Sequence, residues 1–146
     1  MSVNKLLDVI FVYSSVIFNV SVSALYIATK LGELALMQVF GGVVISLMLP
    51  FTITLVGYLR EKATKKIIIS NGIILFYLFL ELLLDYILRI PFREMLEIHI
   101  AYIIIFYAAL FSMISVSLEK NKKMGYLVVI TFLILMVSLV YYLLPF

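Results

Sequence analysis

The sequence contains no cysteine and only one histidine, His99. Without cysteine the chain forms no disulfide, offers no thiolate nucleophile and cannot ligate a metal or an iron–sulfur cluster through sulfur. A single histidine also excludes a bis-histidine haem within one chain. We therefore expect no metal site and no cofactor.

Charged residues are also scarce, at 13% of the 146 residues, whereas 66% of the residues are hydrophobic. Soluble domains average about 25% charged and about 45–50% apolar residues, so the composition excludes a water-soluble domain. The net charge of +3 does not indicate a nucleic-acid partner, because no basic patch is interleaved with surface aromatic residues. The glycine pair at positions 41 and 42 belongs to no phosphate-binding loop, since neither GxxxxGK nor GxGxxG occurs.

Long apolar runs fill almost the whole chain. A helix needs about 20 apolar residues to cross the hydrocarbon core of a bilayer, and short dyad alternation of the kind found in barrel strands is lacking. The sequence thus predicts an all-α fold, a single transmembrane domain over residues 1–146 with five helices. They are expected at residues 6–29, 34–59, 67–88, 98–118 and 124–144.

The distribution of lysine and arginine predicts the orientation of these helices. If five helices are threaded, most of the positive residues lie on one side, which the positive-inside rule assigns to the cytoplasm. The N-terminus is then cytoplasmic and the C-terminus outside, and we expect the inner membrane of a prokaryotic cell. Tyrosines near the predicted interfaces fit aromatic belts that contact membrane lipids, namely Tyr26, Tyr58, Tyr86, Tyr102, Tyr126, Tyr141 and Tyr142.

The third predicted helix carries the strongest chemical signal. Polar residues recur there every four positions, so they follow one helical face: Tyr77, Glu81, Asp85, Arg89 and Arg93. Carboxylates inside an apolar span are costly and tend to face the bundle interior, where they mark sites or pathways. Two close carboxylates in a low dielectric do not both ionise, so we expect one of them to hold a proton. The alternative is an ion-pair ladder that only orients helices.

Polar or small residues of all five helices fall near one depth, if straight helices rise about 1.5 Å per residue. They are Asn19, Gln38, Gly42, Glu81, Tyr102, Tyr107 and Ser138. A stripe at helical spacing on the first helix should face protein and not lipid; it contains Ser15, Asn19, Ser23 and Tyr26. On the second helix, Pro50 removes a backbone donor and should loosen the carbonyl of Ser46, which predicts a kink.

These patterns favour a small membrane protein that binds a small molecule or ion in an outward-facing polar cavity, with a proton-coupled carrier as one form of it. The expected binding residues are Asn19, Gln38, Tyr77, Glu81, Asp85, Arg89 and His99. We found no internal repeat, so a carrier would need a second copy of the chain, which leaves a homo-oligomer open. The half of the bundle nearer the cytoplasm should be closed and apolar. A cysteine at position 19 or 38 should then react from outside, and one at position 48 or 74 should not.

Two other functions remain open. A membrane-embedded enzyme acting on a lipid would use Glu81 or Asp85 as acid–base residue, assisted by His99, with Arg89 or Arg93 binding an anionic headgroup. A non-catalytic subunit of a membrane complex would use the charged face as an interface with another protein. The sequence does not decide among these functions or specify catalytic residues.

Overall fold

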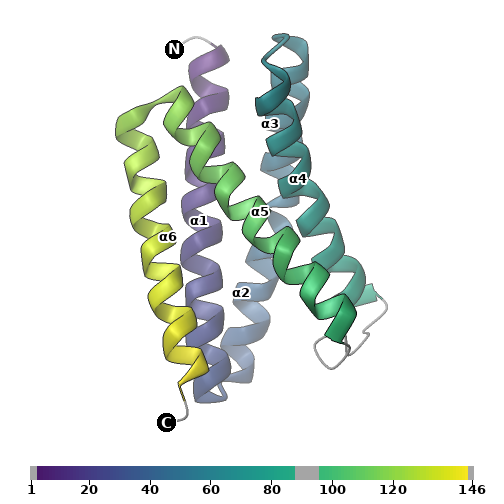
Figure 1. The fold of residues 1–146 in the computed structure, drawn as a ribbon, viewed down its shortest axis with the longest axis vertical. Helices are drawn as coiled ribbons and strands as arrows, with labels where there is room; N and C mark the ends of the chain where they lie inside the picture. Colours follow the sequence, from purple (N-terminus) through teal and green to yellow (C-terminus); the bar gives the residue numbers. More distant parts are fainter. Residues whose placement is uncertain (1–2, 88–95, 145–146) are drawn as a thin grey trace.

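The computed structural model describes residues 3–87 and 96–144, and the side chains of residues 6–84 and 97–144. The chain is helical, and the described residues include no strand. The elements are α1 Val3–Leu31, α2 Leu34–Ser46, α3 Met48–Arg60, α4 Lys65–Glu81, the π-helix η1 Leu82–Ile87, α5 Leu96–Lys120 and α6 Lys122–Leu143. Figure 1 shows a bundle whose two termini lie at opposite ends.

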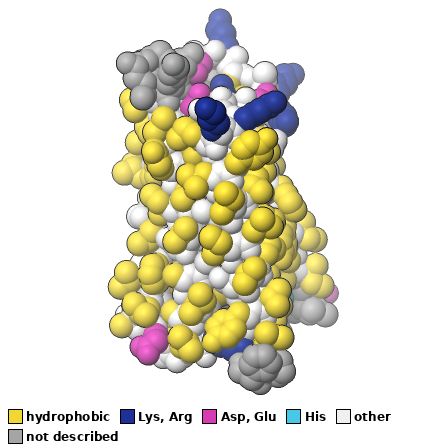
Figure 2. Space-filling model, turned by 90° about the vertical axis from the view of Figure 1, so that its left-hand side faces the viewer, with side chains coloured by type: hydrophobic (Ala, Val, Ile, Leu, Met, Phe, Trp, Pro, Cys, Tyr) yellow, Lys and Arg dark blue, Asp and Glu magenta, His cyan; other side chains and the backbone are white. Residues whose placement is uncertain are grey.

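Within the described part of the chain, five helical segments are long and apolar enough to cross a membrane. They are Leu6–Leu31, Leu34–Arg60, Lys65–Leu84, Glu97–Lys120 and Lys122–Leu143. The predicted number of helices long and apolar enough to span a membrane is confirmed, and their ends agree to within a few residues. Hydrophobic side chains cover the flank of the bundle, and Lys and Arg gather at one end (Figure 2). The side of the membrane on which that end lies stays a prediction.

Helix α1 is the centre of the bundle, since it contacts α2, α3, α5 and α6. The stripe predicted to face protein does so, because Ser15, Asn19 and Ser23 are all buried. At the end of α1, the Lys30 ammonium donates hydrogen bonds to the carbonyls of Tyr141 and Leu144. A cation at the last carbonyls of a helix is favourable, so Lys30 ties α1 to the C-terminal end of α6.

The second span is broken at Leu47, between α2 and α3. Pro50 comes three residues later and has no backbone N–H to donate to the carbonyl of Ser46. The missing hydrogen bond is the reason for which the sequence predicted a kink here. The hydroxyl of Ser46 donates to the carbonyl of Val43 (2.7 Å). The predicted kink thus lies at a one-residue break, across which helical hydrogen bonds continue from the Leu47 N–H to the Val43 carbonyl and from the Phe51 N–H to the Leu47 carbonyl.

The third span departs from the prediction of a regular helix over residues 67–88. Helix α4 ends at Glu81, and the chain continues as the π-helix η1 over Leu82–Ile87. In a π-helix the backbone hydrogen bonds run from i to i+5, so the four-residue repeat expected beyond Glu81 does not continue on regular α-helical geometry. π-helical turns are frequent at functional sites.

The lysine-rich end of the bundle is closed but is not apolar, which corrects the expectation for this half. Phe11, Phe51 and Tyr58 pack there with almost no exposure, and the Phe11 and Phe51 rings meet edge to face with centroids 5.5 Å apart. Polar groups are buried among them in pairs. The Tyr58 hydroxyl donates to Asp8 (3.0 Å), so Tyr58 is a core residue and not an interface anchor.

A second polar pair lies nearby, where the amide of Asn71 is 2.8 Å from the hydroxyl of Thr54. Asn71 and Thr54 are both fully buried. Polar side chains are tolerated in such a core when they hydrogen-bond across helices. Residue-by-residue hydrophobicity could not show that these partners meet. On α6 in this half of the bundle, Val128 is buried, whereas Ile130 is exposed.

Candidate functional site

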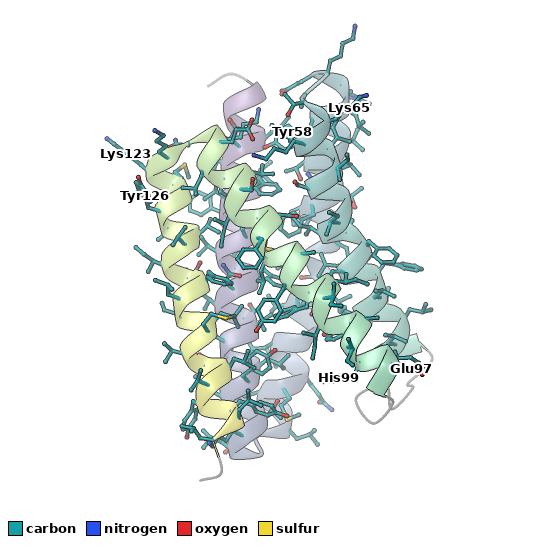
Figure 3. All side chains as sticks on the ribbon, viewed as in Figure 1. Tyr58, Lys65, Glu97, His99, Lys123 and Tyr126 are labelled. Carbon is teal, nitrogen blue, oxygen red and sulfur yellow. The ribbon has the colours of Figure 1, made fainter. Side chains whose placement is uncertain are left out.

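A cavity of about 490 Å³ lies in the half of the bundle away from the lysine-rich end. All five spans line it, with Val22, Leu25 and Tyr26 from α1, Gly41 and Val44 from α2, Tyr77 and Glu81 from α4, His99, Tyr102, Ile103, Phe106 and Tyr107 from α5, and Leu139, Tyr142 and Leu143 from α6. In Figure 3, His99 lies toward the end of the bundle where Glu97 is labelled, opposite Lys65 and Lys123. The lining is mainly apolar and aromatic, which differs from the polar cavity expected from the sequence.

Glu81 is the acidic residue of this lining and is 8% exposed. Its Oε2 accepts a hydrogen bond from the Tyr77 hydroxyl (3.0 Å) and another from the Tyr102 hydroxyl. The two hydroxyl oxygens are 2.8 Å apart. Tyr77 is one turn before Glu81 on α4, so helical spacing brings these two together, whereas Tyr102 comes from α5. Two helices therefore fix the position of one carboxylate.

His99 belongs to the same lining but contributes differently. Its Nδ1 is buried and makes no hydrogen bond within the described residues. A ring nitrogen of histidine donates or accepts according to its protonation. His99 precedes Tyr102 by three residues on α5, which places both side chains on one face of that helix. His99 thus contributes an imidazole to the lining, with a buried Nδ1 that makes no hydrogen bond to a described residue.

The structure brings together three of the expected binding residues, Tyr77, Glu81 and His99. Two others lie elsewhere. Asn19 is 1% exposed and faces α6, where its Nδ2 donates to the Thr131 hydroxyl (3.0 Å). Gln38 is exposed on α2 and does not line the cavity.

The remaining expected residues, Asp85, Arg89 and Arg93, lie wholly or in part outside the described residues. The backbone of Asp85 belongs to η1, but its side chain lies outside the described residues, and so do Arg89 and Arg93 entirely. The predicted pairing of Asp85 with Arg89, and the headgroup contact of Arg93, therefore stay predictions.

Several lining residues were not expected to bind a ligand. Tyr26 and Tyr142 fit an aromatic belt by sequence, and their rings pack together with centroids 5.4 Å apart at the cavity. On the second span it is the buried Gly41, and not its exposed neighbour Gly42, that lines the cavity. The spacing of His99, Tyr102 and Phe106 at three and four residues was the sequence signal that could have found this wall.

The chemistry available to the cavity is limited. Among its described lining residues are one carboxylate, one imidazole and several phenols, with no serine, threonine or lysine. No three His, Cys, Asp or Glu side chains in the described part of the chain are grouped so as to hold a metal ion. Such a lining suits the binding of a mostly apolar molecule that carries one polar or charged group.

No protein-family model, no curated protein and no solved structure matches this chain.

Proposed function

We propose that this chain is an integral membrane protein that binds a small amphipathic molecule in the cavity between its five spans. The observation that carries the proposal is a cavity of about 490 Å³ to which every span contributes and into which a buried carboxylate is fixed. Ligand pockets typically measure about 300–1,000 Å³, are mainly apolar and contain few polar groups that orient the ligand. By the positive-inside rule, the cavity end of the bundle is the outer end.

The contacts of Glu81 favour ligand binding over catalysis on a lipid substrate. Two tyrosine hydroxyls donate to its carboxylate and anchor the group, whereas an acid–base residue would act on a nucleophile or a substrate proton. The described lining offers no hydroxyl or thiol nucleophile other than phenols. Transport would require more than binding. A carrier needs a second conformation that opens the lysine-rich end, where Phe11, Phe51 and Tyr58 are buried in the core.

The accessibility of the cavity can be measured by cysteine labelling, because the chain has no cysteine of its own. Val44 lines the cavity and Ile74 is fully buried without lining it. A membrane-impermeant maleimide should react with Val44→Cys from the Lys30 end and should leave Ile74→Cys unmodified. Adding the neutral arene 1-aminoanthracene should slow the reaction at position 44 by occupying the cavity.

The matched control is Leu31→Cys, which is at the same end of the bundle, 61% exposed and outside the cavity lining. The arene should leave its labelling rate unchanged, which separates occupation of the cavity from a general effect on the membrane. An inert Val44→Cys, or equal slowing at positions 31 and 44, would contradict the proposal.

The structure also predicts that Asn19 acts in helix packing and not in binding. Asn19→Ala removes the hydrogen bond to Thr131 of α6, and interhelical hydrogen bonds of this kind contribute about 0.6 kcal/mol on average. We expect the free energy of unfolding to fall by about this amount. It is measured by the loss of helical circular dichroism during titration with sodium dodecyl sulfate. Protection of a cysteine at position 44 by the arene should stay unchanged. Loss of protection in the folded variant would show that Asn19 contributes to binding after all.

A further inference from the structure

A second hollow, a surface groove of about 420 Å³, lies at the lysine-rich end of the bundle and shares no lining residue with the cavity. It is formed where α1 packs on α3, and its described lining is Leu7, Thr52, Ile53, Val56, Gly57, Arg60 and Glu61. Leu7 is buried and packs against Gly57, since a Cβ at position 57 would lie 2.5 Å from the Leu7 Cδ1. Ile53 and Val56 are exposed. The groove therefore has an apolar floor and opens at the surface.

Helical spacing orders the groove by depth. Ile53, Val56 and Arg60 are three and four residues apart, so they follow one face of α3. Arg60 is the last residue of α3 and of the second span. At about 1.5 Å per residue, Val56 lies about 6 Å and Ile53 about 10 Å further into the span. In a bilayer, the apolar part of the groove thus lies at the depth of acyl chains, and its charged end lies at the depth of headgroups.

The charged end of the groove carries both signs. Arg60 is exposed, and Glu61 beside it is partly exposed. An ion pair at this end of the bundle joins Lys66 to Glu119 (3.6 Å), whereas neither Arg60 nor Glu61 pairs with a described residue. One carboxylate oxygen of Glu61, Oε1, is buried without a hydrogen-bond partner. A cation and an anion side by side match a ligand group that itself carries both charges.

We infer that the groove binds one phospholipid whose headgroup carries a phosphate and a primary ammonium, phosphatidylethanolamine, from the leaflet at the lysine-rich end. The Arg60 guanidinium donates to the phosphate oxygens, which its planar fork fits. The Glu61 carboxylate accepts hydrogen bonds from the ammonium. An acyl chain lies along Ile53 and Val56. The inference uses the location of the chain in a membrane and does not use the ligand of the cavity.

Other phospholipids fit the charged end less well. Phosphatidylcholine has the same phosphate, but its quaternary ammonium has no N–H to donate to Glu61. Phosphatidylglycerol has no cation, so the Glu61 carboxylate would face an anionic headgroup. Lysines attract anionic lipids through the general surface potential, and that attraction acts around the whole lysine-rich end. A preference for the ethanolamine headgroup confined to the groove is therefore the distinguishing result.

The test uses tryptophan fluorescence, because the chain has no tryptophan of its own. Leu59 is 52% exposed, precedes Arg60 and does not line the groove, so Leu59→Trp reports on lipid bound there. The full chain with this substitution is reconstituted in bilayers in which one lipid of the mixture has brominated acyl chains that quench the fluorescence. Quenching should give phosphatidylethanolamine about a threefold or higher affinity over phosphatidylcholine and phosphatidylglycerol, as expected for a hydrogen bond to a charged group at a partly exposed site.

The matched reporter is Tyr126→Trp on α6. Tyr126 is 59% exposed and lies outside the groove, near Lys123 at the same end of the bundle (Figure 3). Phosphatidylethanolamine and phosphatidylcholine should quench this reporter with equal affinity. An equal preference for phosphatidylethanolamine at positions 59 and 126 would overturn the inference, because the preference would then belong to the whole surface and not to the groove.

Substitutions in the Leu59→Trp chain separate the two charged groups. Glu61→Gln should abolish the preference for phosphatidylethanolamine over phosphatidylcholine. Arg60→Gln should weaken the binding of both lipids by about threefold or more through the lost phosphate contact. The control is Glu119→Gln, which removes another carboxylate at this end and should leave the preference unchanged.

The lipid comparison keeps Arg60 and Glu61 intact, so it stands even if a charge variant does not fold. A lack of preference at position 59, a preference for phosphatidylglycerol there, or a preference that survives Glu61→Gln in the folded protein would overturn the inference. The proposed function is tested separately. If the arene protects a cysteine at position 44 and position 59 shows no lipid preference, the cavity binds its ligand and the groove inference is wrong.

Discussion

Gly125→Ala should lower the free energy of unfolding by about 1–3 kcal/mol, the usual cost of overpacking a close contact. A Cβ at position 125 would lie 2.7 Å from the Cα of Leu118 and 2.8 Å from its backbone nitrogen. Backbone atoms cannot rotate away, and a single residue, Asn121, separates the end of α5 from the start of α6. The two helices would have to move apart.

Gly42→Ala is the matched control, because a Cβ at position 42 would have no neighbour within 4 Å. Position 42 lies within α2, where alanine is a better helix former than glycine, so this variant should gain about 0.5–1 kcal/mol. Titration of the helical circular dichroism with sodium dodecyl sulfate measures both variants. Changes of the same sign would show that the close approach of α5 and α6 does not limit stability.

A cysteine at position 33 should react with an impermeant maleimide in intact cells, and one at position 64 should react only after the membrane is permeabilised. Glu33 and Thr64 are both exposed and lie in turns at opposite ends of the bundle. The end that contains Thr64 also contains most of the described cations, namely Arg60, Lys62, Lys65, Lys66, Lys120, Lys122 and Lys123. Loops rich in lysine and arginine stay in the cytoplasm.

This measurement also decides which side the ligand comes from. Neither substitution removes a lysine or an arginine, so the charge bias that is tested stays intact. Permeabilised cells serve as the control that both cysteines are reactive. The reverse pattern would place the cavity on the cytoplasmic side, and the proposed ligand would then be taken from the cell interior.

The sequence alone determined the number of spans and the buried character of Glu81. Both follow from local physics, since about 20 apolar residues in a row specify a spanning helix and a carboxylate within such a run is driven toward other protein groups. The stripe of Ser15, Asn19, Ser23 and Tyr26 was likewise predicted to face protein; the first three are buried and Tyr26 is partly buried. Pro50 indicated the break at Leu47 because proline acts on its own helix.

Only the tertiary structure decided which residues share the cavity. Depth estimated from straight helices failed between α1 and α6, since Asn19 contacts Thr131 and not Ser138, seven residues further along α6. The direction of a side chain also depends on how each helix is rotated about its axis. An apolar helix has no strong polar face to set that rotation, so Gly41 lines the cavity where Gln38 and Gly42 were expected, and Tyr142 does so in place of Ser138.

The same reason explains the pairs at the closed end. Asp8 with Tyr58, and Asn71 with Thr54, are far apart in sequence and meet through helix packing. Hydropathy records each residue separately and cannot show that one polar group satisfies another. The sequence therefore determined the class of fold and identified Glu81 as the carboxylate that is costly to place in an apolar span. Helix rotation and packing determined that Tyr102 of α5 reaches Glu81 of α4 and that their surroundings are aromatic.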